Sequence, residues 1–156
     1  MAPNLIVTNH HVVEGSKFLE IKKYDGTMTF GKVEKIDIDK DLALVKVESN
    51  GPPLSFFSGK EFPLGSPVDA IGHPSEFPFS ITRGVVSAIR DMDLAGSGKK
   101  IALIQTDAPI NGGNSGGPLF FQNEVIGVNV IKRIDNYAEG LGFAVHHSEV
   151  IDFLYQ

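Results

Sequence analysis

Residues 112–118 read Gly-Gly-Asn-Ser-Gly-Gly-Pro, and an apolar run, 119–121, follows directly. Glycine adopts positive φ and lets backbone N–H groups approach a ligand, so a serine among glycines suits a turn whose main-chain donors face a developing negative charge. A nucleophilic serine with an oxyanion hole requires that arrangement. The stretch also fits a glycine-rich β-turn in which Ser115 bonds its own backbone. Partner residues elsewhere in the chain must decide between these interpretations.

A serine hydroxyl is a weak nucleophile and needs a base within hydrogen-bond reach, together with a group that holds the base in its useful tautomer. In residues 5–13 an apolar strand runs out into a polar turn that carries His11. Asp41 directly precedes segment 42–47, in which apolar residues alternate as in a strand. The chain order is therefore His, Asp, Ser, which is the order of the chymotrypsin type of protease.

Four blocks of the chain resemble the HtrA (Deg) family of trypsin-like serine proteases. In the family's order, they are Thr8–Val13, Asp41–Leu44, Gln105–Pro118 and Gly140–Val145. The resemblance covers nearly the whole chain and implies an all-β fold: a two-lobed, trypsin-like double β-barrel with a short C-terminal helix. It also implies a serine endopeptidase that hydrolyses peptide bonds of unfolded or misfolded proteins without a metal or organic cofactor.

The resemblance assigns a role to each residue of a catalytic triad. Ser115 would attack the peptide carbonyl, His11 would accept its proton, and Asp41 would orient the imidazole. The backbone N–H groups of Gly113, Asn114 and Ser115 are the candidate oxyanion hole.

His10 is the competing candidate for the base. The family places the base just before a Val-Val pair, where His11 stands, and often has asparagine at the position of His10. Adjacent side chains on an extended backbone point in opposite directions, so only one of the two can reach Ser115. We therefore expect His10 to be a solvated turn residue. The two aspartates within residues 37–39 are interpreted as turn carboxylates, because only Asp41 directly precedes the apolar run.

The substrate preference is predicted from the pocket positions. Trypsin-like enzymes that cut after basic residues carry an aspartate six positions before the serine, and Pro109 stands there in this chain. Cleavage after Arg or Lys is therefore not expected, and the pocket positions that the resemblance implies predict a small or medium aliphatic residue before the cut. The resemblance places pocket and substrate-strand residues at Ile110, Asn129, Val130, Ile131 and Phe143. Ordinary barrel core is the alternative interpretation of these apolar side chains, above all of Phe143.

The chain is predicted to form a succession of short strands, most of them rich in β-branched or aromatic residues and ended by Gly, Pro, Asn or Asp. They are Leu5–Thr8, Phe18–Lys22, Thr27–Asp37, Leu42–Val47, Pro67–Ile71, Ser80–Ile89, Ile101–Thr106, Pro118–Phe121, Val125–Ile131 and Leu141–Val145. The Gly- and Pro-marked residues 49–65 mark the seam between two lobes. We expect a first β-lobe over 1–60 that carries the histidine and aspartate, and a second over 61–147 that carries the serine.

One helix is predicted, over residues 148–156. Ser148 can cap it, Glu149 favours its positive end, and Val150, Ile151 and Leu154 form an apolar stripe.

Composition excludes several other classes of protein. With 156 residues, 42% of them hydrophobic, the chain can bury a real core. The net charge of −5 and the lack of a basic cluster argue against a nucleic-acid partner. The absence of cysteine excludes disulfide scaffolds and thiolate metal sites, and the scattered histidines lack metal-ligand spacing. No apolar run is long enough to cross a bilayer, and residues 1–3 do not resemble a signal peptide.

The chain departs from the family pattern in two ways. The first lobe has only about four recognisable strands, which leaves an unpaired edge, and the peptide-binding PDZ module typical of the family is absent. The competing hypothesis is therefore a protease-like module that binds peptides or a partner without cutting them. A third hypothesis, a β-barrel that carries a ligand, would require the resemblance of all four blocks to be coincidental. The family resemblance further implies polypeptide substrates, a homo-oligomer (a trimer) and an extracytoplasmic location, either periplasmic or secreted.

Overall fold

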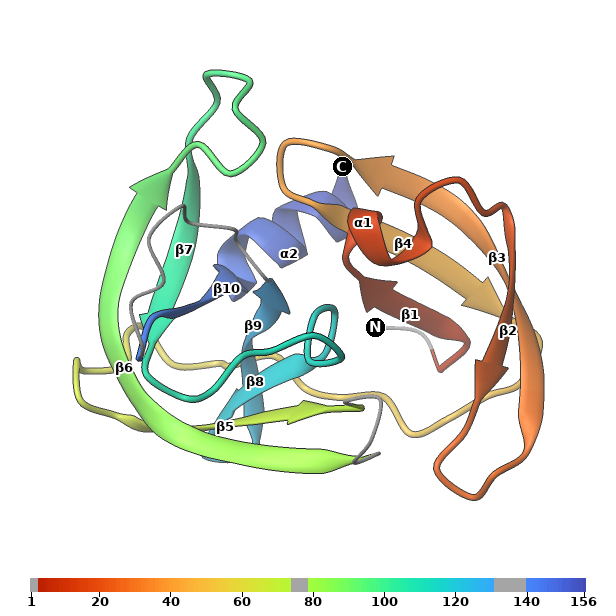
Figure 1. Ribbon diagram of the computed structural model, residues 1–156, viewed down its shortest axis with the longest axis horizontal. Coiled ribbons are helices and arrows are strands. Elements are labelled where there is room, and N and C mark those ends of the chain that lie inside the picture. The colour runs from red at the N-terminus through yellow and green to blue at the C-terminus, as the bar shows by residue number, and fades with distance from the viewer. Residues whose placement is uncertain (1–2, 74–78, 131–139) are drawn as a thin grey trace.

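A computed structural model describes residues 3–73, 79–130 and 140–156 of the chain. Ten strands and two short helices are present in these residues, and they form two β-rich lobes with helix α2 beside both (Figure 1). The all-β fold with a short C-terminal helix is confirmed.

The first lobe is an open sheet of four antiparallel strands in the order β1-β4-β3-β2. Its strands are β1 (Leu5–Thr8), β2 (Phe18–Lys22), β3 (Met28–Asp37) and β4 (Leu42–Val47). Alternation of apolar and polar residues gives the sheet one buried face, which packs on the short helix α1 (His10–Val13). The four strands match the number that the sequence predicts for this lobe.

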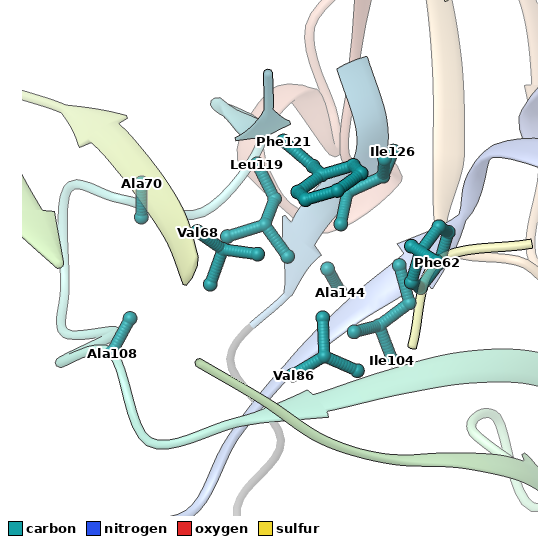
Figure 2. Close-up of a cluster of buried hydrophobic side chains, with 10 residues drawn as sticks. All are labelled: Phe62, Val68, Ala70, Val86, Ile104, Ala108, Leu119, Phe121, Ile126 and Ala144. Carbon is teal, nitrogen blue, oxygen red and sulfur yellow. The ribbon is translucent and has the colours of Figure 1, made fainter. Parts of the chain in front are cut away.

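The second lobe is a closed barrel with the strand order β10-β7-β6-β5-β8-β9. Its strands are β5 (Pro67–Gly72), β6 (Ser80–Met92), β7 (Ile101–Thr106), β8 (Pro118–Phe121), β9 (Glu124–Val130) and β10 (Gly142–His146). Figure 2 shows the buried side chains that fill its interior, which come from every strand of the barrel, from the segment before it and from the loop after β7. They are Phe62, Val68, Ala70, Val86, Ile104, Ala108, Leu119, Phe121, Ile126 and Ala144.

A second core cluster joins the lobes through helix α2 (His147–Tyr155). Val150 and Phe153 of this helix pack against Leu42 of the first lobe and Val145 of the second. The segment between the lobes also takes part, because Phe56 packs against this shared cluster and forms a parallel bridge with Val125 of β9. The outer face of the barrel therefore supplies the surface that holds the lobes together.

The predicted strands lie within a few residues of the observed ones, with three differences. Strand β6 runs on to Met92, with a register shift between Val86 and Ala88. Ile131, the predicted end of β9, lies outside the described residues. Helix α1 was not predicted, because a four-residue turn of helix leaves no periodic pattern.

The cap of helix α2 differs from the prediction. The helix begins at His147 rather than Ser148, and the side chain of His146 accepts a hydrogen bond from the backbone N–H of Ser148 at 3.1 Å. The Ser148 hydroxyl lies 2.8 Å from the same ring nitrogen. An imidazole thus takes the capping position expected of the serine.

The rings of His146 and His147 stack at 4.4 Å between centroids, beside Phe57 and Phe62. Burial and, to a lesser extent, the nearby His147 lower the pKa of His146 to about 4, although Glu149 opposes the shift. Burial also lowers the pKa of His147. Both rings are therefore held neutral in the folded chain near pH 7.

We predict that acid weakens the fold through this pair. The unfolded chain binds a proton on His146 near pH 6.5, whereas the folded chain does so near pH 4. Stability is therefore full above pH 6.5 and is lost as the pH falls toward 4, by on the order of 1 kcal/mol at pH 5. Urea unfolding at pH 7 and pH 5 measures the loss. His146→Asn keeps a capping acceptor without a titrating ring, so it should reduce the difference between the two pH values; an unchanged difference would contradict the assignment.

Candidate active site

His11 and Asp41 form a directly bonded pair in the first lobe. The Nδ1 atom of His11 lies 2.5 Å from Oδ2 of Asp41, and the backbone N–H of His11 donates to Oδ1 at 2.9 Å. The main-chain carbonyl of Asp41 accepts from His10 N at 3.0 Å and from Asn9 Nδ2 at 3.1 Å. Residues 9–11 therefore fix both the carboxylate and the backbone of Asp41.

The sheet brings these two segments together. Strands β1 and β4 are antiparallel neighbours with Thr8 opposite Ala43, so the end of β1 lies beside the beginning of β4. Asn9 follows one strand and Asp41 precedes the other. The side chain of Asp41 can therefore reach the turn that carries His11.

One of the two arguments for His11 over His10, that the backbone is extended at this point, is wrong. Residues 10–13 are helical rather than extended, so the two side chains are separated by the helical rotation of about 100° and not by the alternation of a strand. His11 directs its ring to Asp41, whereas His10 contacts Asp41 through its backbone N–H.

The other two aspartates of this turn have separate partners. Asp37 accepts a hydrogen bond from the backbone N–H of Lys40 at 3.0 Å, as expected of a turn carboxylate. Asp39 accepts from the hydroxyl of Ser97 at 2.6 Å, a contact that reaches the second lobe and that the sequence did not indicate.

Ser115 lies in a turn that leads into β8. The turn is closed by hydrogen bonds from Asn114 N to Asn111 O and from Gly117 N to Asn114 O, both at 3.0 Å. Positive φ angles of 98° at Gly113 and 84° at Gly116 confirm the need for glycine on both sides of the serine. Because the N–H of Asn114 already donates within the turn, this group serves the turn rather than an outside acceptor.

Neighbouring elements hold the turn from two directions. Gly116 N donates to Asn129 O at 2.9 Å and Asn129 N donates to Gly117 O at 2.8 Å, which ties the turn to β9. On the other side, His73 N donates to Gly113 O at 2.9 Å. Ser115 is therefore carried by a turn with fixed ends.

The serine turn packs against the first lobe. A Cβ atom added to Gly116 would lie 2.2 Å from Thr8 Oγ1 and 3.2 Å from Asn9 N. These residues immediately precede the two histidines. The turn of Ser115 and the His11–Asp41 pair thus meet between the lobes, where Figure 1 shows the loop before β8 beside β1.

The predicted pocket residues fall into different environments. Ile110 is half-buried against the barrel core, and a Cβ added to Gly142 would lie 2.7 Å from its Cγ1. Asn129 and Val130 are buried on β9. Phe143 is buried in the core cluster shared with α2. Ile131 lies outside the described residues.

The described part of the chain contains no group of three or more His, Cys, Asp or Glu side chains that could hold a metal ion. Among these residues, no helix has the length and apolar character that crossing a lipid bilayer requires.

The family described as "Trypsin-like peptidase domain" matches residues 1–128. The chain belongs to the trypsin-like peptidase family, and within it to the HtrA (Deg) serine proteases. It is 42% identical over 144 residues to the putative serine protease HhoB of Synechocystis, and 35% identical over 153 residues to the serine protease Do-like HtrA of Bacillus subtilis. These matches cover 90% and 93% of the chain, and 34% of each relative, so the chain spans about a third of their length.

Solved structures of an HtrA-type protease share the fold. AlgW with a tripeptide superposes with a TM-score of 0.86 at 29% identity, and AlgW with a decapeptide with a TM-score of 0.85 at 30% identity. The alignments cover 99% and 97% of this chain, and 52% and 47% of the AlgW chains. The described residues therefore have the two-lobed trypsin-like architecture of the HtrA proteases.

Asn9, which holds Asp41, was not among the predicted site residues, and the hydrogen bond that Asn129 makes was not predicted. Asn9 and Asn129 are fully buried, and their side-chain amides donate to the carbonyls of Asp41 and Pro118. Buried amides are usually hydrogen-bonded, so an asparagine inside the apolar run 125–130 indicates a polar partner for Asn129.

We predict that Gly116→Ala disrupts this meeting of the lobes. The added methyl would clash with Thr8 and would require positive φ, so we expect a loss of about 2 kcal/mol or more in unfolding free energy. Gly112→Ala is the matched control in the same stretch, because no atom lies within 4 Å of its added Cβ. Urea titration of both variants makes the comparison, and equal losses would contradict the close packing of Gly116.

Proposed function

We propose that the chain is a serine endopeptidase domain in which Ser115, His11 and Asp41 form the catalytic triad. The observation that carries the proposal is the 2.5 Å contact between His11 Nδ1 and Asp41 Oδ2, beside a glycine-rich serine turn that packs on the same strand end. The relatives named serine protease, and the HtrA-type neighbour solved with peptides, support the same chemistry.

Each residue of the triad has one role in this mechanism. The carboxylate of Asp41 holds the Nδ1 proton of His11, which leaves Nε2 available as a base. His11 takes the hydroxyl proton of Ser115 as Oγ attacks the peptide carbonyl, and then gives it to the leaving amine. Water attacks the acyl-enzyme by the same route and restores Ser115.

The oxyanion of each tetrahedral intermediate is assigned to the backbone N–H groups of Gly113 and Ser115. The positive φ of Gly113 and the bond from His73 N to its carbonyl support this assignment, because they orient the peptide units around that residue. Asn114, the third donor that the sequence suggested, is left out because its N–H donates to Asn111. Such a donor contributes on the order of 3 kcal/mol to the transition state.

The specificity pocket is assigned to Ile110, to Asn129 and Val130 of β9, and, by the family resemblance alone, to Ile131. Pro109 stands at the position where a carboxylate would select a basic side chain, and its carbonyl accepts from Thr82 Oγ1 at 2.8 Å and from Asn114 Nδ2 at 3.1 Å. An apolar pocket of this kind favours a small or medium aliphatic residue before the cut. Phe143 supports the barrel from within the second core cluster.

The wider biology rests on the family alone. Unfolded or misfolded polypeptides as substrates, a trimer of chains, and a periplasmic or secreted location are proposals from the resemblance to HtrA proteases. The division into a first lobe over 1–60, a second over 61–147 and a helix over 148–156 is also proposed.

We predict that a fluorophosphonate probe adds covalently to Ser115, as seen by intact mass. Ser115→Ala should abolish labelling, and His11→Ala should reduce its rate by on the order of 10³ or more, because the nucleophile then lacks its base. His10→Ala is the matched control and should label like the parent. A folded parent chain that is not labelled would contradict the proposal. It would favour the alternative, a module that binds peptides without cutting them, and the open sheet of the first lobe is the feature that supports this alternative.

We predict cleavage after Val, Ala, Leu or Ile, and not after Lys or Arg, when a denatured protein is digested and its fragments are sequenced by mass spectrometry. Ile110→Gly should broaden the preference toward larger residues, because it removes the side chain assigned to the pocket wall. Cleavage mainly after basic residues would overturn the pocket assignment while leaving the triad intact.

A further inference from the structure

The residue directly before Asp41 is a buried lysine. Lys40 is only 2% exposed, although a lysine ammonium loses much solvation when it leaves water. Its backbone N–H donates to Asp37 and its side chain runs to helix α2, while Asp41 turns the opposite way to bind His11. One turn thus joins the triad to the last element of the fold.

The ammonium of Lys40 is held by two acidic residues of α2. It lies 2.7 Å from Asp152 Oδ2, 3.1 Å from Glu149 Oε2 and 3.3 Å from the carbonyl of Glu149. The other carboxylate oxygen of Glu149 accepts from Ala102 N at 2.9 Å, which extends the network to β7. Desolvation lowers the pKa of Lys40, but the hydrogen bonds that its ammonium donates to Asp152 and Glu149 outweigh this effect and raise the pKa above its usual value.

Asp41 needs support of this kind. Its backbone has φ of 50°, a left-handed conformation that non-glycine residues adopt at some energetic cost. Such a conformation persists only where the surroundings impose it. Residues 9–11 hold Asp41 from one side, and Lys40 fastens its N-terminal neighbour to α2 from the other.

We propose that Lys40 is a positioning residue that sets the orientation of the Asp41 carboxylate toward His11 by anchoring the β3–β4 turn to helix α2. The inference rests on the proposed triad. It assigns to α2 a role in the chemistry beyond packing, since the helix holds the aspartate's turn in place.

Lys35 provides a matched control, because it binds the same helix without adjoining Asp41. Its ammonium donates to the carbonyl of Phe153 and, at 2.8 Å, to that of Gln156, and it lies 4.8 Å from the centre of the Phe153 ring. Loss of Lys35 should loosen the end of α2 but leave the turn of Asp41 untouched. The pair of lysines therefore separates docking of the helix from positioning of the aspartate.

The test compares Lys40→Met, Lys40→Arg and Lys35→Met in this chain. The first readout is the low-field proton NMR signal of His11 Nδ1–H, which reports the bond to Asp41 and needs no turnover. The second is kcat and KM for a peptide that carries an aliphatic residue before the cut. We expect Lys40→Met to lose or shift the signal and to lower kcat between about tenfold and a hundredfold with KM unchanged. Lys40→Arg should restore most of kcat, and Lys35→Met should keep both readouts.

Two results would overturn the inference. One is a Lys40→Met variant with the parent's signal and kcat. The other is an equal loss in Lys35→Met, which would mean that docking of the helix alone matters. If Lys40→Met does not fold, Asp152→Asn takes its place, because Asp152 is half-exposed and the change weakens the anchor while keeping the lysine. Failure of the proposed function is recognised separately, because it appears as a parent chain in which the probe does not label Ser115. In that case the NMR signal of His11 Nδ1–H still decides whether Lys40 positions Asp41.

Discussion

The bonding of Asp41 to residues 9–11 is the interaction on which the site depends. Four hydrogen bonds from three consecutive residues converge on one aspartate, two on its carboxylate and two on its main-chain carbonyl. They fix the imidazole of His11 in direction and in tautomer, which a base needs before it can serve a nucleophile. The sheet makes this possible because β1 and β4 pair in the register that brings their ends together.

The second lobe meets this pair through glycine. A side chain at Gly116 would fill the space that the backbone of the serine turn uses to approach Thr8. The contact joins the open sheet of the first lobe to the closed barrel of the second. Groups held on separate rigid lobes can be placed accurately, since the core of each lobe resists distortion.

Helix α2 and the segment around Phe56 connect the lobes at a distance from the serine turn. Phe153 fills apolar space beside Leu42, and Lys40 brings a charge into the same region. A buried lysine with two carboxylate partners contributes little net stability compared with apolar packing, but it specifies one geometry. The conformation of Asp41 and the docking of the last helix are thus linked through neighbouring residues.

The sequence by itself determined the strands, the order of the chemical groups and the residues of the candidate triad. These follow from local signals: alternation along each strand, glycines that permit positive φ, and an aspartate at the start of an apolar run. Only the tertiary structure decided how they are held. It showed that Asn9 binds the carbonyl of Asp41 and Asn129 that of Pro118, and that His146 rather than Ser148 caps α2. It also showed that Asn114 donates within its own turn and that Lys40 lies buried against the helix. The physical reason is that each of these interactions is made with a partner that only folding brings near, or depends on backbone geometry that residue type leaves open.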